Sequence, residues 1–207
     1  MYFVSEKLNK LDDKMTYNQY RPIDGIKDMI NKMIIKAIDK SEIIPTRMLV
    51  LDDKNLRSTK EFINAFPTVP VDVVEMCDTV HEAQNDVLMT NASLYKVTLH
   101  HNILSEHLLA CSTNINVVYF DYFATFIGNI RERIHPCNDI CTFLKHTTTD
   151  QCIMALNLST RGSGRGPKYI INGIKAIFRK YKWKFEMRDI IPRYDKNRFF
   201  TVYELKK

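Results

Sequence analysis

The segment Asn116–Asn129, NVVYFDYFATFIGN, joins a buried-strand pattern to residues that could do chemistry. Its start, Val117 to Phe120, is a near-continuous apolar run, typical of a strand covered on both faces in a parallel sheet. We expect this strand to end at Asp121. Open α/β sheets bind ligands beyond the carboxyl ends of their strands, so Asp121 and the adjacent Tyr122 are candidates to face a substrate. Alternatively, Asp121 only caps the following turn or helix.

A basic, glycine-rich stretch is the second candidate. RGSGRGPK, residues 161–168, holds three of the six glycines, and Arg161, Arg165 and Lys168 stand among them before an expected helix. This arrangement suits phosphate groups or another anion. The spacing differs from GxGxxG, which argues against a dinucleotide site, and a solvated loop without a ligand is the alternative. Tyr181 and Trp183 lie among further basic residues and could stack on bases or simply pack a strand.

Histidine and cysteine give little support to a hydrolase triad or a metal centre. No histidine has a Ser or Cys partner at a recognisable spacing, and we expect the histidines, His100, His101 and His107 among them, on the surface. The five cysteines are odd in number and include no CxxC pair, which favours reduced thiols in an intracellular, cytoplasmic protein. Cys137 and Cys141 could share a helix face, but their spacing matches no common zinc motif, so we expect no metal.

Composition is that of a globular protein large enough for one complete core. The 207 residues are 45% hydrophobic and 26% charged, with a net charge of +6, which modestly favours a polyanionic partner. No apolar stretch reaches the roughly 18 to 20 residues that cross a bilayer, and the first residues lack the apolar core of a signal peptide.

Hydrophobic periodicity predicts strands that alternate with helices, which indicates a largely parallel sheet. We expect a lead-in helix over Thr16–Lys40, with Lys27 on its solvent face, and a short helix that Ser58 could cap. A hairpin around Arg193–Asn197 should make the last strand antiparallel. The other expected strands are Arg47–Asp52, Val71–Glu75, Tyr95–Leu99 and Cys152–Leu158, and the later helices are Thr79–Leu88, Ile103–Ala110, Asn138–Lys145 and Tyr169–Tyr181.

Acidic and amide residues fall at successive ends of these expected strands: Asp52 and Asp53, then Glu75, then Asn102, then Asp121-Tyr122-Phe123. In this and in the order of its elements, the chain resembles the class I S-adenosylmethionine-dependent methyltransferases. The resemblance implies a Rossmann-like three-layer sandwich of about seven strands in residues 47–207, with residues 1–46 as a lead-in part of the same domain. It also implies S-adenosyl-L-methionine as cofactor, with Asp121 and Tyr122 facing the methyl acceptor. The residues placed to hold the cofactor are Asp52, Asp53, Ser58, Thr59, Glu75, Met76, Asn102 and Ile103.

The family's glycine-rich turn after the first strand is missing. Lys54, Leu56 and Ser58 stand where the glycines would be. Either side chains such as Ser58 and Thr59, with a helix N-terminus, hold the methionine end, or cofactor binding has been lost.

These alternatives lead to two functions. One is a methyltransferase for a nucleic acid, RNA rather than DNA, or for another nucleotide-bearing substrate. The other is a catalytically inactive methyltransferase-like subunit that binds RNA or a protein partner. A nicotinamide-dependent reductase has little support. A hydroxyl acceptor would need a lysine near its oxygen, and the sequence singles out none.

Overall fold

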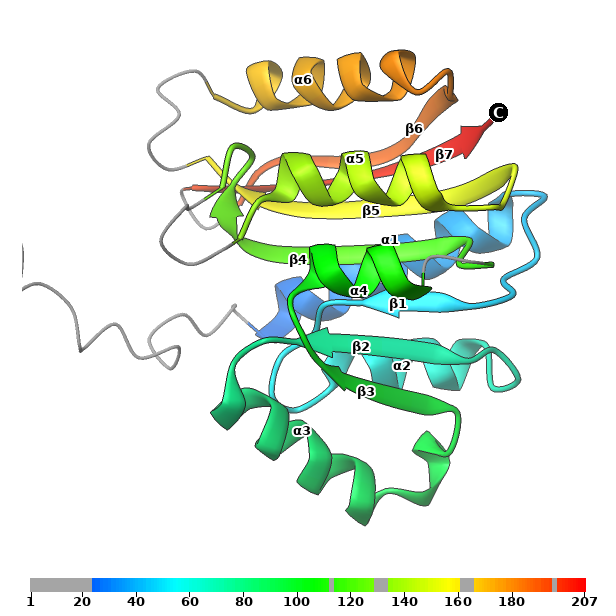
Figure 1. Cartoon of the computed structure of the whole chain (residues 1–207), viewed down its shortest axis with the longest axis vertical. Helices are drawn as coiled ribbons and strands as arrows, with labels where there is room; N and C mark the ends of the chain where they lie inside the picture. Colours follow the sequence, from blue (N-terminus) through cyan, green and yellow to red (C-terminus); the bar gives the residue numbers. More distant parts are fainter. Residues whose placement is uncertain (1–23, 112–113, 129–133, 161–165, 195–196) are drawn as a thin grey trace, which may run out of the picture.

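The computed structural model describes residues 24–111, 114–128, 134–160, 166–194 and 197–207. These residues form one seven-stranded sheet in the order β3-β2-β1-β4-β5-β7-β6 (Figure 1). Strands β1 to β5 pair in parallel, and β7 runs antiparallel to both β5 and β6. The strands are β1 (Met48–Val50), β2 (Val71–Glu75), β3 (Val97–His101), β4 (Val117–Thr125), β5 (Gln151–Ser159), β6 (Lys184–Tyr194) and β7 (Arg198–Lys206).

Helices cover both faces of the sheet. Helices α1 and α2 lie on one face and α4, α5 and α6 on the other, while α3 runs beside β2 and β3 (Figure 1). Within the described part of the chain, no helix is both long and apolar enough to cross a bilayer. The helices are α1 (Asp24–Lys40), α2 (Arg57–Ala65), α3 (Asp78–Thr90), the short 3₁₀ helix η3 (Ala92–Leu94), α4 (Leu104–Cys111), α5 (Pro136–His146) and α6 (Gly166–Lys180).

Alternation along the central strands divides the apolar residues between two cores. In β4, Val117 and Tyr119 pack in the core under α1 and α2, whereas Val118 and Phe120 pack in the core under α4 to α6. Side chains two residues apart share a face of a strand, so Asp121 faces the α1 side and Tyr122 the opposite side. The alternation therefore separates two residues that are neighbours in sequence.

The predicted fold class is confirmed, including the antiparallel hairpin at the C-terminus. Several boundaries were predicted wrongly, and three of them bear on the site. Strand β4 continues through Asp121 to Thr125, although its pairing with β5 becomes irregular after Asp121. Strand β3 begins at Val97, because Tyr95 lies at the end of a 3₁₀ turn that delays the strand. Strand β1 contains only Met48–Val50. The expected start of the lead-in helix at Thr16 lies outside the described residues.

Candidate functional site

Three carboxylates stand side by side at the carboxyl edge of the sheet. In the register of the central strands, Val50 of β1 is opposite both Val73 of β2 and Tyr119 of β4. Two residues beyond these positions, on the same face, come Asp52, Glu75 and Asp121. Neighbouring strands are about 4.8 Å apart, so this row of carboxylates spans about 10 Å. The strand order reverses between β1 and β4, the place where open α/β sheets bind ligands.

Lys27 of α1 forms ion pairs with two members of this row, Asp121 and Asp52. Its side chain is buried, and Nζ lies 2.5 Å from Asp121 Oδ2 and 3.5 Å from Asp52 Oδ1. The ammonium group also lies 5.2 Å from the centre of the Tyr119 ring. The prediction that Lys27 faces solvent is therefore wrong, since the residue is only 2% exposed.

A signal for this burial was present in the sequence. Lys27 and Asn31 fall on the same helical stripe as Ile30, Ile34 and Ile38, at steps of three and four residues. All five are buried in the structure. A lysine on an apolar stripe needs a charged partner, because burial of an unpaired charge is costly. The sequence pattern could not reveal that this partner is Asp121, which lies 94 residues further along the chain.

Asp121 accepts hydrogen bonds from three elements. Besides Lys27, Asn157 Nδ2 of β5 donates to its Oδ1 at 2.6 Å and Arg198 Nη2 of β7 at 2.9 Å. Burial alone would raise the pKa of Asp121, but Lys27 and Arg198 outweigh it and lower the pKa below its ordinary value. Burial likewise opposes the charge on Lys27, yet Asp121 and Asp52 hold the pKa of that ammonium well above its ordinary value. The pair therefore stays ionised at neutral pH.

The Asp52 carboxylate accepts hydrogen bonds from the turn that follows it. Its Oδ1 accepts from the backbone N–H groups of Asp53 at 2.8 Å and Ser58 at 3.3 Å, and its Oδ2 accepts from that of Thr59 at 2.7 Å. Asp52 thus fills the N-terminus of α2 that we had expected to receive the methionine carboxylate. The hydroxyl oxygens of Ser58 and Thr59 are buried and have no hydrogen-bond partner among the described residues.

The turn between β1 and α2 forms without glycine. Leu56 precedes the helix with φ 52° and ψ 41°, in the left-handed region that favours glycine. Its side chain is fully buried, so packing offsets the backbone strain. The helix begins at Arg57, so the prediction that Ser58 caps it is wrong. Asp53 pairs with Arg57 at 2.7 Å within the same turn.

Glu75 and Asn102 meet at the tips of β2 and β3. The backbone N–H of Asn102 donates to the carbonyl of Glu75 at 3.1 Å. The Oε1 of Glu75 accepts from the backbone N–H of Cys77 at 2.8 Å, and Asn102 Oδ1 accepts from that of Ile103 at 2.7 Å. Burial raises the pKa of Glu75 despite the backbone donors. Met76 beside it is exposed, so this end of the row borders solvent.

Tyr122 lies away from the carboxylate row. Its hydroxyl donates to Asp139 Oδ2 at 2.9 Å inside the core under α4 to α6, on the face opposite Asp121. Burial and the Asp139 carboxylate hold the pKa of Tyr122 well above its ordinary value. The side chains that contact Asp121 are those of Lys27, Asn157 and Arg198. The sequence analysis assigns none of these three residues to the site.

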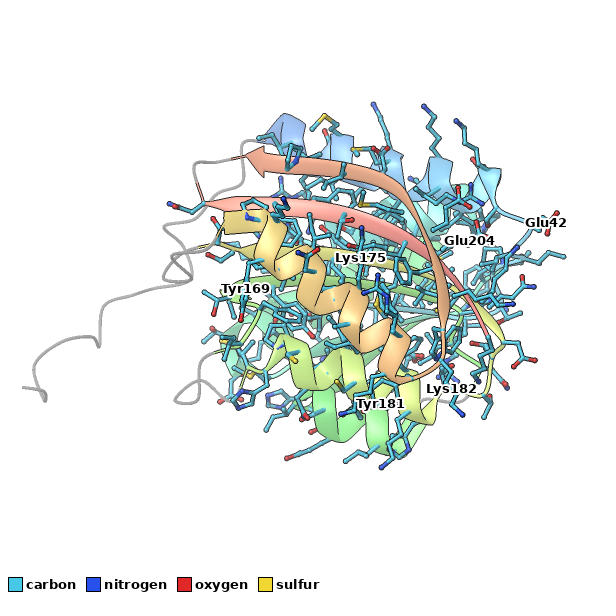
Figure 2. All side chains as sticks on the ribbon, turned by 90° about the horizontal axis from the view of Figure 1, so that it is seen from above. Glu42, Tyr169, Lys175, Tyr181, Lys182 and Glu204 are labelled. Carbon is cyan, nitrogen blue, oxygen red and sulfur yellow. The ribbon has the colours of Figure 1, made fainter. Side chains whose placement is uncertain are left out.

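The expected basic surface is only partly described. Arg161 and Arg165 lie outside the described residues, while Lys168 is exposed in the first turn of α6. Figure 2 shows Tyr169 and Lys175 along α6, with Tyr181 and Lys182 just past its end. Trp183 is only 3% exposed, with Lys207 Nζ 5.0 Å from its ring centre. Of the two roles considered, Trp183 therefore has the structural one: it packs at the start of β6. Its ring is too buried to stack on a base.

Comparison with known proteins finds likeness in structure alone. No family model and no curated protein sequence matches this chain. Fibrillarin from Methanococcus jannaschii, a pre-rRNA processing protein, superposes with a TM-score of 0.61 at 13% identity, over 84% of this chain and 74% of its own.

Two further structures extend this likeness. Precorrin-6y C5,15-methyltransferase from Geobacter metallireducens gives a TM-score of 0.60 at 12% identity, over 95% of this chain and 96% of its own. Trm1 from Pyrococcus horikoshii, in complex with S-adenosyl-L-methionine, gives 0.66 at 12% identity, over 87% of this chain and 55% of its own. The chain therefore has the Rossmann-like fold of the class I S-adenosylmethionine-dependent methyltransferases.

Proposed function

We propose that this protein is an S-adenosylmethionine-dependent methyltransferase whose acceptor site lies at the Lys27–Asp121 pair. The observation that carries the proposal is this buried ion pair at the point where the strand order reverses, between β1 and β4. A buried pair is weak evidence for stability, because desolvation opposes its Coulomb attraction. A buried ion pair at a ligand-binding position of the fold therefore supports a functional role.

The adenosyl group is proposed to bind at the tips of β2 and β3. The Glu75 carboxylate can accept from both ribose hydroxyls, and Met76, Asn102 and Ile103 line the adjoining turns. Asp52 and Asp53, with Ser58 and Thr59, would act indirectly, because their polar backbone and carboxylate groups hold the turn after β1. This division leaves the far end of the row, at Asp121, for the acceptor.

A hydroxyl group fits the Lys27–Asp121 pair better than a base nitrogen does. In transfer to a hydroxyl, the oxygen would take the methyl group as the methyl–sulfur bond of S-adenosylmethionine breaks and would release its proton to water. An ammonium group would stabilise the negative charge that develops on that oxygen. The raised pKa of Lys27 keeps it protonated, so its proposed role is electrostatic and not that of a base. Lys27 would thus be the lysine that a hydroxyl acceptor needs near its oxygen, which the sequence alone did not identify.

RNA is the proposed substrate class. The net charge of +6 favours a polyanion, and Lys168, Lys175 and Lys182 add cations along α6 and just past its end. Fibrillarin, named as a pre-rRNA processing protein, shares the fold. The measurement is transfer of a radiolabelled methyl group from S-adenosylmethionine to total RNA, with total protein as the competing acceptor.

Calorimetry with S-adenosylmethionine and its demethylated product tests the cofactor site. We expect micromolar binding by the wild type, weakened about 10- to 100-fold by Glu75→Gln, because a hydrogen bond to a charged group contributes about 1.5–3 kcal/mol. Glu82→Gln, at an exposed position of α3, is the matched control and should bind as the wild type does. Equal binding by Glu75→Gln would place the cofactor elsewhere.

A second candidate function is a non-catalytic subunit with this fold. The observation that favours it is the capture of the α2 N-terminal amides by Asp52, which leaves them unavailable to a methionine carboxylate. This candidate predicts no heat with either ligand from the folded wild type, together with binding of RNA whose affinity falls steeply with salt.

A further inference from the structure

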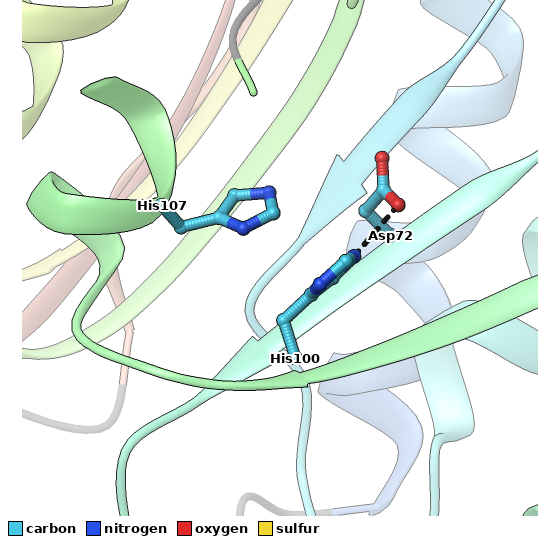
Figure 3. A group of neighbouring side chains, drawn as sticks. All are labelled: Asp72, His100 and His107. Atoms are coloured by element: carbon cyan, nitrogen blue, oxygen red, sulfur yellow. Dashed lines mark hydrogen bonds and ion pairs between the residues drawn. The ribbon is translucent and has the colours of Figure 1, made fainter. Parts of the chain in front are cut away.

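A histidine–aspartate cluster lies away from the carboxylate row, on the other face of the sheet. Asp72 comes from β2, His100 from β3 and His107 from α4 (Figure 3). One ligand atom from each of the three residues lies within 4.8 Å of the other two. Asp72 and His107 are only 1% and 3% exposed, so the cluster is largely inside the protein. The expectation that His107 lies on the surface is wrong.

Asp72 is held in place from two sides. Arg47 Nε donates to its Oδ2 at 2.5 Å and Arg47 Nη2 to its Oδ1 at 2.9 Å, while His100 Nε2 lies 2.9 Å from Oδ1. Burial would raise the pKa of Asp72, but Arg47 and His100 outweigh it and lower the pKa. The carboxylate is therefore ionised, as a metal ligand must be.

His107 has an unused nitrogen that faces this carboxylate. Its ring lies 4.3 Å from that of His100, centre to centre, and extends from α4 toward Asp72 (Figure 3). The Nε2 atom is buried and has no hydrogen-bond partner among the described residues. Burial, assisted by His100, lowers the pKa of His107, which keeps the imidazole neutral. A buried polar atom without a partner is costly, and a bound cation would relieve that cost.

We propose that Asp72, His100 and His107 bind a divalent transition-metal ion of the Zn²⁺ type. Two imidazole nitrogens and one carboxylate oxygen form a ligand set that zinc accepts, with a fourth position open. Ligands about 2.0–2.2 Å from a common ion lie about 3.4 Å apart, so a small closure of the side chains completes the site. The ion replaces the contacts to Oδ1, while the bond from Arg47 Nε keeps Oδ2 oriented, as outer donors do in metal sites.

The ion would join three elements around one turn. His100 and His107 lie on either side of the turn that carries Asn102 and Ile103. A metal bound to both, and to β2 through Asp72, would fix the position of that turn relative to the sheet. The proposal concerns metal binding and structure, so it does not depend on methyl transfer.

Titration of the metal-stripped protein with Zn²⁺ tests the site. We expect one ion per chain and a Tm that rises with the logarithm of free Zn²⁺ concentration, because the ion binds the folded state. His107→Ala and His100→Ala should each weaken binding at least about 100-fold, since loss of even an outer partner weakens binding 10- to 100-fold. His146→Ala, on α5, is the matched histidine control and should bind like the wild type.

Thiols are the competing ligands, and Cys137 and Cys141 lie close together on α5. The double variant Cys137→Ser/Cys141→Ser should keep full Zn²⁺ affinity. Loss of binding in that variant, or unchanged binding in folded His107→Ala, overturns the proposal. If His107→Ala fails to fold, X-ray absorption at the zinc edge of the wild type decides: imidazole and oxygen ligands without sulfur support the site, and a sulfur ligand overturns it.

Discussion

The Lys27–Asp121 pair joins α1 to β4, with side chains that are only 3% and 9% exposed. Loss of one partner leaves the other charge buried, so we expect Lys27→Met to lower the free energy of unfolding by about 3–5 kcal/mol. Lys27→Met/Asp121→Asn should recover part of that loss, because the carboxylate that lost its ammonium partner is gone. Urea denaturation measures both.

Lys36→Met, on the exposed side of α1, is the control and should change stability by less than about 0.5 kcal/mol. Simple additivity of the Lys27 and Asp121 substitutions would mean that the two charges are not coupled.

Asp139 predicts a pH dependence of stability. Burial raises its pKa from 3.8 to about 6, against the hydrogen bond from Tyr122 and the charge of His135. A carboxyl whose folded pKa is raised adds stability below its unfolded pKa, and that stability is lost as pH rises through the folded value. The shift of about 2 units corresponds to about 3 kcal/mol, lost between about pH 4 and pH 6.

The comparison is between the wild type and Asp139→Asn, whose side chain can still accept from the Tyr122 hydroxyl. The unfolding free energy of the wild type, minus that of the variant, should fall by up to about 3 kcal/mol from pH 4 to pH 7. Asp86→Asn, exposed on α3, controls for the loss of one negative charge. A pH-independent difference would contradict the raised pKa.

At the scale of elements, α6 packs on the loop after β4 through a glycine. A Cβ built on Gly173 would lie 2.7 Å from Cε1 of the buried Phe126 ring. Alanine is favoured over glycine in a helix by about 1 kcal/mol, but overpacking costs about 1–3 kcal/mol. We therefore expect Gly173→Ala to be destabilising by up to about 2 kcal/mol in thermal or urea denaturation.

Gly25→Ala in α1 is the matched variant, because a Cβ there meets nothing within 4 Å. It should stabilise the protein by up to about 1 kcal/mol. Equal stabilisation by both alanines would mean that Phe126 moves aside at no cost.

The turn after β1 shows how an element can keep its shape without its usual residues. Leu56 adopts the left-handed conformation expected of glycine, and its buried side chain anchors the turn in the core under α1 and α2. Asp52 supplies the cap that Ser58 was expected to provide. The sequence indicated that glycine was missing, but only the backbone revealed that the conformation had been retained.

For the whole molecule, the two cores share one sheet, and the carboxylate row and the histidine–aspartate cluster lie on its opposite faces. The carboxylate row draws residues from or just after β1, β2 and β4, which are distant in sequence, whereas the cluster joins β2 to the consecutive elements β3 and α4. The carboxylate row is explained by the parallel register, which brings Glu75, Asp52 and Asp121 level with one another. The order of helices and strands was sufficient to predict that Glu75 ends β2, whereas β4 continues past Asp121 to Thr125.

The sequence by itself determined the alternation of strands and helices, the antiparallel hairpin and the position of Glu75 at the end of β2, because these depend on local periodicity. Only the tertiary structure decided that Lys27 pairs with Asp121, that Asp52 caps its own turn, that Tyr122 faces the opposite core and that Asp72 meets two histidines. Each of these depends on which face a side chain occupies and on which distant residue meets it there. A buried polar group takes its partner from whichever element packs against it, and that packing is set by the whole chain.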